Sequence, residues 1–408
     1  MIRLGLPLAV LLTAAPLSAA ADGNGLAVGE TARLHASFET EARYDTLAAL
    51  GGVGAAANPV FNPGDLITHL RPGLRLDAPG SQLTFTGGAR LDYAYFTGIG
   101  GPTRDLSFLG AFADANLDIG HGGPATFTIA DHFSRSDVTS NAALGLGTIT
   151  DANGLEGKLN LRPGGGALEF NLGYLFGLEA YELHSPGNVG CPATQPSCDG
   201  TKYGGFGSLT HRGLVDVRYR FLPKTALIVE GVWALRTYQS QAQNIQTAPL
   251  RVSGGLLGLI TEKVRVLLKA GYENSFAQSG ANFGGFVGQG EIGWEPRETT
   301  KFAAGLLRSI EPVSDTYGWY QDLRVYASAS VLLAGRVLVT AGGNGDQLAF
   351  ANRGRVDLQV QGNGTVEYQF NRFLKAGTGV VLTLRDSSEG GVFTYQRAEI
   401  FGRITATY

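Results

Sequence analysis

The chain has 408 residues, and its formal net charge of -3 shows no basic excess, which argues against nucleic acid as a partner. Beyond the N-terminal segment, no apolar stretch approaches the roughly 18 uninterrupted residues that a membrane-spanning helix needs. Glycine is abundant, with 60 residues, and only 16% of the residues are charged, a composition that suits tightly turned strands.

The N-terminal segment has the pattern of a secretory signal peptide. Arg3 precedes an apolar run, which ends in small residues with an A-x-A pattern at Ala19 and Ala21. No cysteine follows this run, so no lipid anchor is expected. We therefore expect residues 1–20 to be a signal peptide cleaved near Ala20, and residues 21–408 to form a single exported barrel domain.

Alternation of polar and apolar residues is clearest from Arg355 to Phe370, a stretch of 16 residues. A period of two indicates a strand with one apolar and one polar face. Strands of soluble proteins usually have about 5 to 6 residues, whereas membrane-spanning strands need about 9 to 11 and often extend beyond the bilayer. The length therefore favours a transmembrane β-barrel over a soluble sandwich.

The same rule predicts about eighteen strands. They are expected near residues 32–46, 65–77, 81–96, 104–119, 124–136, 150–162, 166–182, 207–221, 224–238, 249–260, 263–275, 285–295, 300–310, 317–333, 336–343, 354–370, 373–385 and 391–408. Short turns alternate with longer connections, as in bacterial outer-membrane barrels. The strands near 249–260 and 336–343 are the weakest, so sixteen is the alternative count. An even count places both termini in the periplasm.

The last predicted strand ends on an aromatic residue, Tyr408. This resembles the C-terminal strand of outer-membrane proteins, in which such an ending implies a signal for the barrel-assembly machinery. Pairing with the first strand would close the sheet, because an open edge in hydrocarbon leaves backbone groups unsatisfied. We predict an all-β, antiparallel transmembrane β-barrel in the outer membrane of a Gram-negative cell, in contact with its lipid.

Cys191 and Cys198, the two cysteines of the chain, lie in a polar segment that contains proline. In an exported chain, two close cysteines predict one disulfide bond, here within an extracellular loop near residues 183–206. A metal site is the alternative, but only His184 and Asp199 could join the cysteines as ligands. We expect no metal and no cofactor. The loop could form a constriction or lid, or could simply be a stabilised surface loop.

Over nearly the whole mature chain, the Gly-rich alternating pattern resembles the β-barrel porin 2 type of family. Eighteen strands is also the size of sugar-specific porins and of polysaccharide-export barrels. The resemblance implies a transport function, and it implies periplasmic proteins of a polysaccharide-export or envelope complex as candidate partners.

Alternation also predicts which charged residues face the lumen. The candidates for a transport path are Arg71, Arg75, Arg90, Asp92, Asp114, Asp216, Arg218, Arg220, Arg265, Lys269, Arg355, Arg397, Glu399 and Arg403. They could line a wet conduit or form cross-strand ion pairs in a filled one. Inward aromatics could stack on sugar rings or pack against other groups. These are Phe112, Tyr326, Phe373, Phe393, Tyr395 and Phe401.

Two functions stay open from the sequence. One is an outer-membrane channel for polar solutes or a polysaccharide. The other is a non-conducting structural barrel that anchors an envelope or surface complex, such as a motility or polysaccharide-export assembly. No G-x-S-x-G or H-E-x-x-H motif is present, so an enzyme is not expected.

Overall fold

The computed structural model describes residues 25–47, 64–99, 106–137, 148–183, 207–239, 246–278, 282–312, 318–351, 354–390 and 393–408. The predicted signal peptide lies outside these residues, as do Cys191 and Cys198. Export and the disulfide bond therefore stay predictions. Within the described ranges, no helix is long and apolar enough to cross a bilayer.

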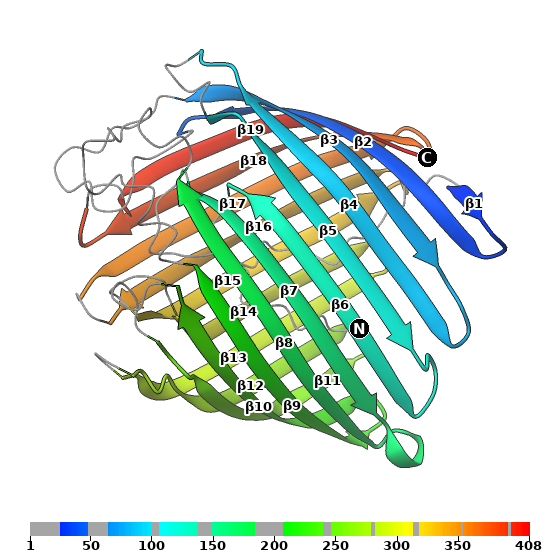
Figure 1. The fold of residues 1–408 in the computed structure, drawn as a ribbon, viewed down its shortest axis with the longest axis vertical. Helices are drawn as coiled ribbons and strands as arrows, with labels where there is room; N and C mark the ends of the chain where they lie inside the picture. The colour runs from blue at the N-terminus through cyan, green and yellow to red at the C-terminus, as the bar shows by residue number, and fades with distance from the viewer. Residues whose placement is uncertain are drawn as a thin grey trace.

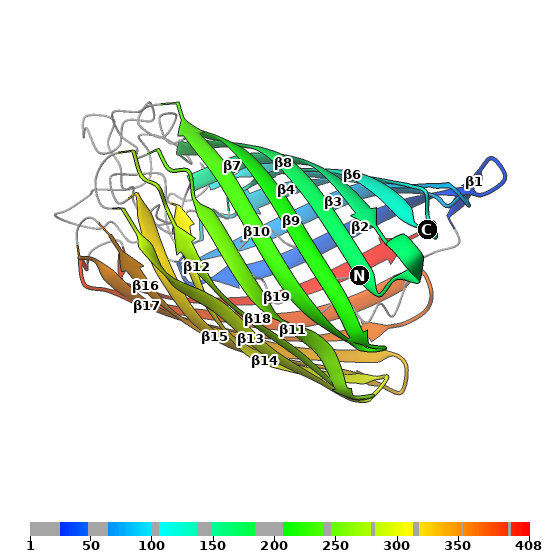
Figure 2. The same cartoon turned by 90° about the horizontal axis from the view of Figure 1, so that it is seen from below.

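One antiparallel sheet contains all the described strands, and it closes on itself (Figures 1 and 2). Each long strand pairs with its neighbours in the sequence, and the last strand, β19, pairs with the first long strand, β2. The short strand β1 folds back against the start of β2. The predicted antiparallel barrel with eighteen long strands is confirmed, and the alternative of sixteen is wrong.

The bounds of the elements are as follows. The strands are β1 (Leu26–Val28), β2 (Ala32–Asp45), β3 (Asp65–Ala78), β4 (Leu83–Phe96), β5 (Phe108–Ile119), β6 (Ala125–Ser136), β7 (Thr148–Leu161), β8 (Leu168–Leu183), β9 (Ser208–Leu222), β10 (Thr225–Tyr238), β11 (Leu250–Thr261), β12 (Val264–Asn274), β13 (Gly284–Arg297), β14 (Thr300–Pro312), β15 (Trp319–Leu333), β16 (Val337–Phe350), β17 (Val356–Gln369), β18 (Leu374–Ser387) and β19 (Tyr395–Thr407). A short 3-10 helix, η2 (Pro163–Gly165), joins β7 to β8.

The fifteenth predicted strand is the one whose bounds differ most from the prediction. We expected it near residues 336–343, but β16 continues to Phe350. Residues 342–345 include three glycines, a composition that predicts a turn. In the barrel this segment pairs with residues 360–363 of β17, so the neighbouring strand keeps it extended. The other seventeen long strands begin and end within four residues of their predicted bounds, whereas β1 was not predicted.

The two ends of the barrel differ in the length of their connections. At the turn end the hairpins are short; between β15 and β16, Ala334 and Gly335 adopt the positive φ that a tight hairpin turn needs. At the loop end the connections are longer, as between Leu183 of β8 and Ser208 of β9. β2 begins and β19 ends at the turn end (Figure 1). That the turn end faces the periplasm stays a prediction.

The outer wall of the barrel is apolar. Aliphatic side chains such as Val325 and Ile400 project from it and are exposed. Aromatic side chains also project outward, with Trp294 toward the turn end and Trp233 and Tyr272 toward the loop end. An aliphatic band between two aromatic girdles is typical of barrels that sit in a bilayer.

Candidate functional site

The fourteen charged residues predicted to line a transport path share one face of the sheet. Within each strand they alternate with exposed outward side chains, as Arg71 does with Leu70. This face is concave, because side chains from strands two apart meet on it: Nζ of Lys269 on β12 lies 2.9 Å from Oε2 of Glu230 on β10. All fourteen therefore lie on the inner wall, while their role in transport stays a prediction.

Arg71, on β3, is the centre of a charge network on the first strands. Its Nη1 donates to Oε1 of Glu39 at 2.7 Å, and its Nε donates to Oδ2 of Asp92 at 2.8 Å. The same Nη1 lies 3.3 Å from Oε2 of Glu41, and Nδ1 of His69 lies 2.8 Å from Oδ1 of Asp92. Charge-assisted bonds of this kind hold Arg71 against the wall, where it is buried.

Ion pairs bridge the seam at which β19 meets β2. Nη2 of Arg397 lies 2.6 Å from Oδ2 of Asp45, across the seam. Glu399 accepts from Nη1 of Arg43 at 2.9 Å and lies 3.4 Å from Arg397. Arg403, further along β19, pairs in the other direction with Glu367 of β17. These contacts tie together the two ends of the chain and stabilise the closed sheet.

Arg355 is fully buried near the loop end. Its guanidinium carbon lies 3.5 Å from the centre of the Phe393 ring and 4.4 Å from that of Phe350. Asp357 accepts two bonds from it, at 2.8 and 2.6 Å, and another at 2.6 Å from Nη2 of Arg385. An arginine between two rings and beside a carboxylate is a rigid arrangement. These groups pack the wall at this level rather than offering a free charge.

Five further predicted residues form ion pairs on the opposite part of the wall. The pairs are Arg218 with Asp216 at 2.7 Å, Arg220 with Glu169 at 2.8 Å, Arg265 with Glu291 at 3.0 Å and Lys269 with Glu230 at 2.9 Å. Arg75 lies 3.0 Å from Asp77. Twelve of the fourteen predicted residues thus make an ion pair, so most of the charge on the inner wall is balanced locally.

Arg90 and Asp114 are the two exceptions, since neither forms an ion pair with another described residue. Both are exposed, on β4 and β5. The guanidinium of Arg90 lies 4.8 Å from the centre of the Phe112 ring, and strand register places His132 of β6, which is also exposed, opposite Asp114. We name Arg90, Phe112, Asp114 and His132 the β4–β6 patch. It presents a cation, an anion, a ring and an imidazole to the lumen.

The accessibility of the inner charges changes along the barrel. Near the turn end, the side chains of Arg75 and Arg265 are 63% and 49% exposed. Near the loop end, those of Asp45, Asp357 and Arg355 are 0% exposed. The charged groups named here therefore meet solvent near the turn end and are shielded from it near the loop end, whereas the β4–β6 patch lies near the middle of its strands and is exposed.

Five of the six predicted inward aromatics, all but Tyr395, have close polar or aromatic neighbours among the described residues. Phe401 lies between two guanidinium groups, those of Arg43 and Arg403, each 5.6 Å from its ring centre. The hydroxyl of Tyr326 donates to Glu291 at 2.7 Å. Phe112 and Phe393 lie against Arg90 and Arg355 as described, and Phe373 stacks on Tyr408 with 6.1 Å between ring centres. Such contacts are those of packed rings, and sugar stacking stays a prediction.

Several members of these networks were not predicted. Asp45, His69, Asp357 and Glu169 all lie on the polar side of the alternation, so the same parity rule could have identified them. The sequence signal says only that a side chain faces inward. It does not say which residue of a neighbouring strand the register places within hydrogen-bonding distance of that side chain. The burial of Asp45 and Asp357 therefore had no sequence signal.

The chemistry available on the inner wall is that of hydrogen bonds and charge. Among the described side chains, no group of three or more His, Cys, Asp or Glu residues could hold a metal ion. The wall can therefore bind and orient polar groups through arginine and carboxylate contacts. Among the fourteen predicted residues, the two whose charges are not already paired, Arg90 and Asp114, belong to the β4–β6 patch.

No family model and no curated protein matches the sequence. Among solved structures, the barrel is similar to the siderophore receptor PirA from Acinetobacter baumannii, with 5% identity, a TM-score of 0.52, and coverage of 94% of this chain and 81% of that one. It is also similar to OccK3 (OpdO) from Pseudomonas aeruginosa, with 11% identity, a TM-score of 0.46, and coverage of 92% and 95%. OccAB4 from Acinetobacter baumannii gives 10% identity, a TM-score of 0.45, and coverage of 92% and 98%.

At such low identity, these likenesses concern the fold alone. The likeness to PirA agrees with a single closed β-barrel. The resemblance to the β-barrel porin 2 type of family stays a prediction, because no family model matches.

Proposed function

We propose that this chain is an outer-membrane channel for polar solutes. The observation that carries the proposal is the closed barrel of eighteen long strands, with an apolar outer wall and a charged inner wall. Barrels of 16 to 18 strands are wide enough to leave an aqueous interior. The two aromatic girdles of the outer wall fit the two surfaces of a bilayer. Export by a signal peptide and assembly by the outer-membrane machinery belong to the same proposal.

The β4–β6 patch is the proposed contact for solutes. Charges that already pair with a neighbour offer little to a passing molecule, whereas Arg90 and Asp114 are exposed and have no ion-pair partner among the described residues. Opposite charges on neighbouring strands set up a transverse field in a narrow aqueous path. Such a patch favours dipolar or hydroxylated solutes over ions of one sign.

A non-conducting structural barrel is the second candidate. The observation that favours it is the burial of the charge networks near the loop end, where Arg355 and Asp357 are inaccessible. In that case the inner wall would be filled and the barrel would anchor a periplasmic or surface complex. Neither candidate is an enzyme.

A polysaccharide is the narrower proposal for the cargo. It rests on the size of the barrel and on a charged wall that could donate to and accept from sugar hydroxyls. Periplasmic proteins of an export or envelope complex would then be partners. Deleting the gene and measuring surface polysaccharide tests this directly; unchanged polymer levels would count against export.

Single-channel recording in planar bilayers tests the main proposal. The refolded full-length mature barrel should give discrete, stable open levels, and the same protein denatured by heat should give none. Folding is checked by the shift in electrophoretic mobility on heating. Two results together would favour the structural barrel instead. The correctly folded barrel would show no open levels in planar bilayers, and deletion of the gene would leave surface polysaccharide unchanged.

A further inference from the structure

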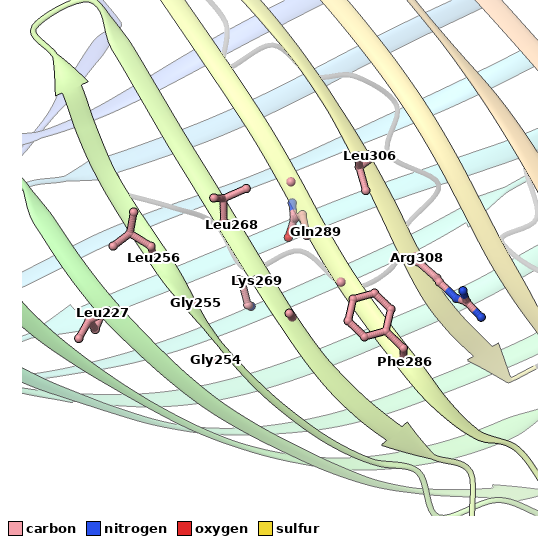
Figure 3. A pocket seen from close by; sticks show the side chains of 13 residues that line it. Leu227, Gly254, Gly255, Leu256, Leu268, Lys269, Phe286, Gln289, Leu306 and Arg308 are labelled. Atoms are coloured by element: carbon pink, nitrogen blue, oxygen red, sulfur yellow. The ribbon is translucent and has the colours of Figure 1, made fainter.

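A groove lies on the outer wall, across the strands β10 to β14 (Figure 3). Its volume is about 560 Å³. The side chains that border it and face outward are Leu227, Leu256, Leu268, Phe286, Leu306 and Arg308. Because these residues alternate with inner-wall residues such as Lys269 along their strands, the groove opens away from the lumen.

Glycines form the floor of the groove. Gly254, Gly288 and Gly290 stand at outward positions where most strands carry a large side chain. The leucine side chains on either side project outward from the wall, and those of Leu268 and Leu306 are both more than half exposed. The result is an apolar trough between rows of leucine side chains, which suits a flexible apolar chain.

Among the described residues that border the groove, Arg308 is the one charged residue on the outer face. It lies four residues before Pro312, the loop-end limit of β14, and directly opposite Gly288 in the strand register. Its Nη2 donates to Oε1 of Gln321 at 3.0 Å, toward the loop end, whereas its Nε is buried and has no hydrogen-bond partner. Gln347, also outward, is exposed on β16.

A cation on the lipid-facing wall is costly unless it reaches the membrane surface or meets an anion. Arg308 lies near the aromatic girdle of the loop end, at the level of Phe286 and Tyr272. The direction of its contact with Gln321 aims the guanidinium toward that surface. An anionic group there would pair with the guanidinium of Arg308 and balance its charge.

We propose that this groove binds one phosphorylated lipid, with an acyl chain in the trough and the phosphate on Arg308. The inference rests on the proposed outer-membrane location, but not on conduction. Such a lipid matches both features of the groove, because its narrow acyl chain fits the apolar trough and its anionic headgroup fits Arg308. Gln321 and Gln347 would donate to the remaining oxygens of the headgroup.

Native mass spectrometry of the purified full-length mature barrel in detergent tests the proposal. The probes are dioleoylphosphatidylglycerol and dioleoylglycerol, which share their acyl chains and differ in the phosphate-bearing headgroup. We expect the barrel to retain the phospholipid about tenfold better than the neutral lipid, the usual effect of one charge-assisted contact. Arg308→Ala should abolish this preference, and Arg308→Lys should keep part of it.

The apolar part of the site has its own variant and control. At Gly290 an added Cβ would meet Leu268 and Leu306 at 3.6 and 3.8 Å, ordinary contact distances, so Gly290→Val should fill the trough without a backbone clash. It should lower the retention of both lipids. Gly402→Val is the matched control, because Gly402 lies on the outer face of β19 with open space around it.

Three results would overturn the proposal. These are equal retention of phospholipid by the wild type and by Arg308→Ala, displacement of the phospholipid by inorganic phosphate alone, and a dimer of this chain whose formation Gly290→Val prevents. The recordings in planar bilayers distinguish a failure of the lipid-site proposal from a failure of the channel proposal. A wild-type barrel that conducts but shows no lipid preference refutes the lipid site alone, and one that binds lipid but stays silent refutes only the channel.

Discussion

The guanidinium of Arg397 makes a two-point contact with the carboxylate of Asp45, with Nη2 2.6 Å from Oδ2 and Nε 3.1 Å from Oδ1. The two residues are 352 positions apart in the sequence, and they meet because β19 closes against β2. Asp45 is completely buried, and its Oδ1 also accepts from the backbone N–H of Leu47. The closing seam therefore contains a carboxylate that depends on a single arginine for its charge balance.

Replacing that arginine should weaken the closed barrel. Arg397→Ala leaves Asp45 charged and buried, a loss that typically costs about 3 kcal/mol. We expect the free energy of unfolding, measured by urea titration of the barrel in lipid vesicles, to fall by this amount. Arg75→Ala is the control, because Arg75 pairs with Asp77 but is mostly exposed, and exposed pairs contribute less than about 1 kcal/mol. Equal losses in the two variants would contradict a special role for the seam.

Tyr408 ends the chain at the turn end of the same seam. Its backbone N–H donates to the carbonyl of Ala36 at 2.8 Å, and its exposed ring stacks on Phe373 at an interplanar angle of 12°. Because the backbone bond does not need the ring, Tyr408→Ala should change the stability of the refolded barrel by less than about 1 kcal/mol.

In cells the same variant should behave differently if the ring is an assembly signal. We expect Tyr408→Ala to reduce the fraction of newly made barrel that becomes heat-modifiable in the outer membrane, measured by pulse labelling. Tyr368→Ala is the control, since Tyr368 is another outward aromatic near the turn end, packed against Phe370 at 4.8 Å. A similar delay in both variants would point to general destabilisation instead of recognition.

Two glycines lie directly against the backbone of the neighbouring strand where β11 pairs with β12. An added Cβ at Gly255 would lie 2.0 Å from the carbonyl oxygen of Leu268, and one at Gly271 would lie 2.3 Å from that of Val252. Both contacts are with the backbone, which cannot rotate away. Gly255→Ala should therefore destabilise the barrel by about 1 to 3 kcal/mol, the usual cost of overpacking.

The neighbouring position supplies the control. At Gly254 an added Cβ has its nearest contact at 3.7 Å, with the carbonyl oxygen of Ile228, so Gly254→Ala should leave the midpoint of urea unfolding unchanged (Figure 3). Both substitutions add one methyl group to the same strand, and they differ only in the face that receives it. If Gly255→Ala also leaves the midpoint of urea unfolding unchanged, β11 and β12 can move apart at this point without a loss of stability.

Glycines also explain why the sequence predicted some strands less clearly than others. The alternation of side chains predicted eighteen strands because a period of two survives wherever one face is apolar. It weakened in β11 and β16, where glycine replaces side chains on both faces. In β16 the segment 342–345 is extended because β15 and β17 pair with it, a tertiary constraint that local sequence does not express.

For the candidate site, the sequence predicted which side chains face the lumen but not which partners they have. Parity placed Arg71 and Arg90 alike on the inner wall, yet Arg71 is shared by three carboxylates, whereas Arg90 is exposed and stacks on Phe112. That difference arises from the residues that the register brings opposite each arginine on the neighbouring strands. Arg308 was overlooked for a simpler reason, since it is a charge on the apolar side of its own alternation.

The β4–β6 patch leads to the last prediction, on ion selectivity. In a conducting barrel, Arg90→Glu should shift the reversal potential in a salt gradient toward cation selectivity, because it replaces an exposed positive charge with a negative one. Asp114→Asn should shift it in the opposite direction by a smaller amount, since only one unit of charge changes. Both effects should shrink in 1 M salt, where the Debye length falls to about 3 Å.

Arg324→Gln is a useful comparison for the patch, because Arg324 is also on the inner wall but pairs with Asp322 and Asp346. Its removal changes the net charge by one unit, as Asp114→Asn does, at a site that is far less exposed. If exposure decides which charges a passing ion meets, Arg324→Gln should move the reversal potential less than Arg90→Gln does. A larger shift for Arg324→Gln would place the narrowest part of the path at β15 and β16 and remove the patch from it.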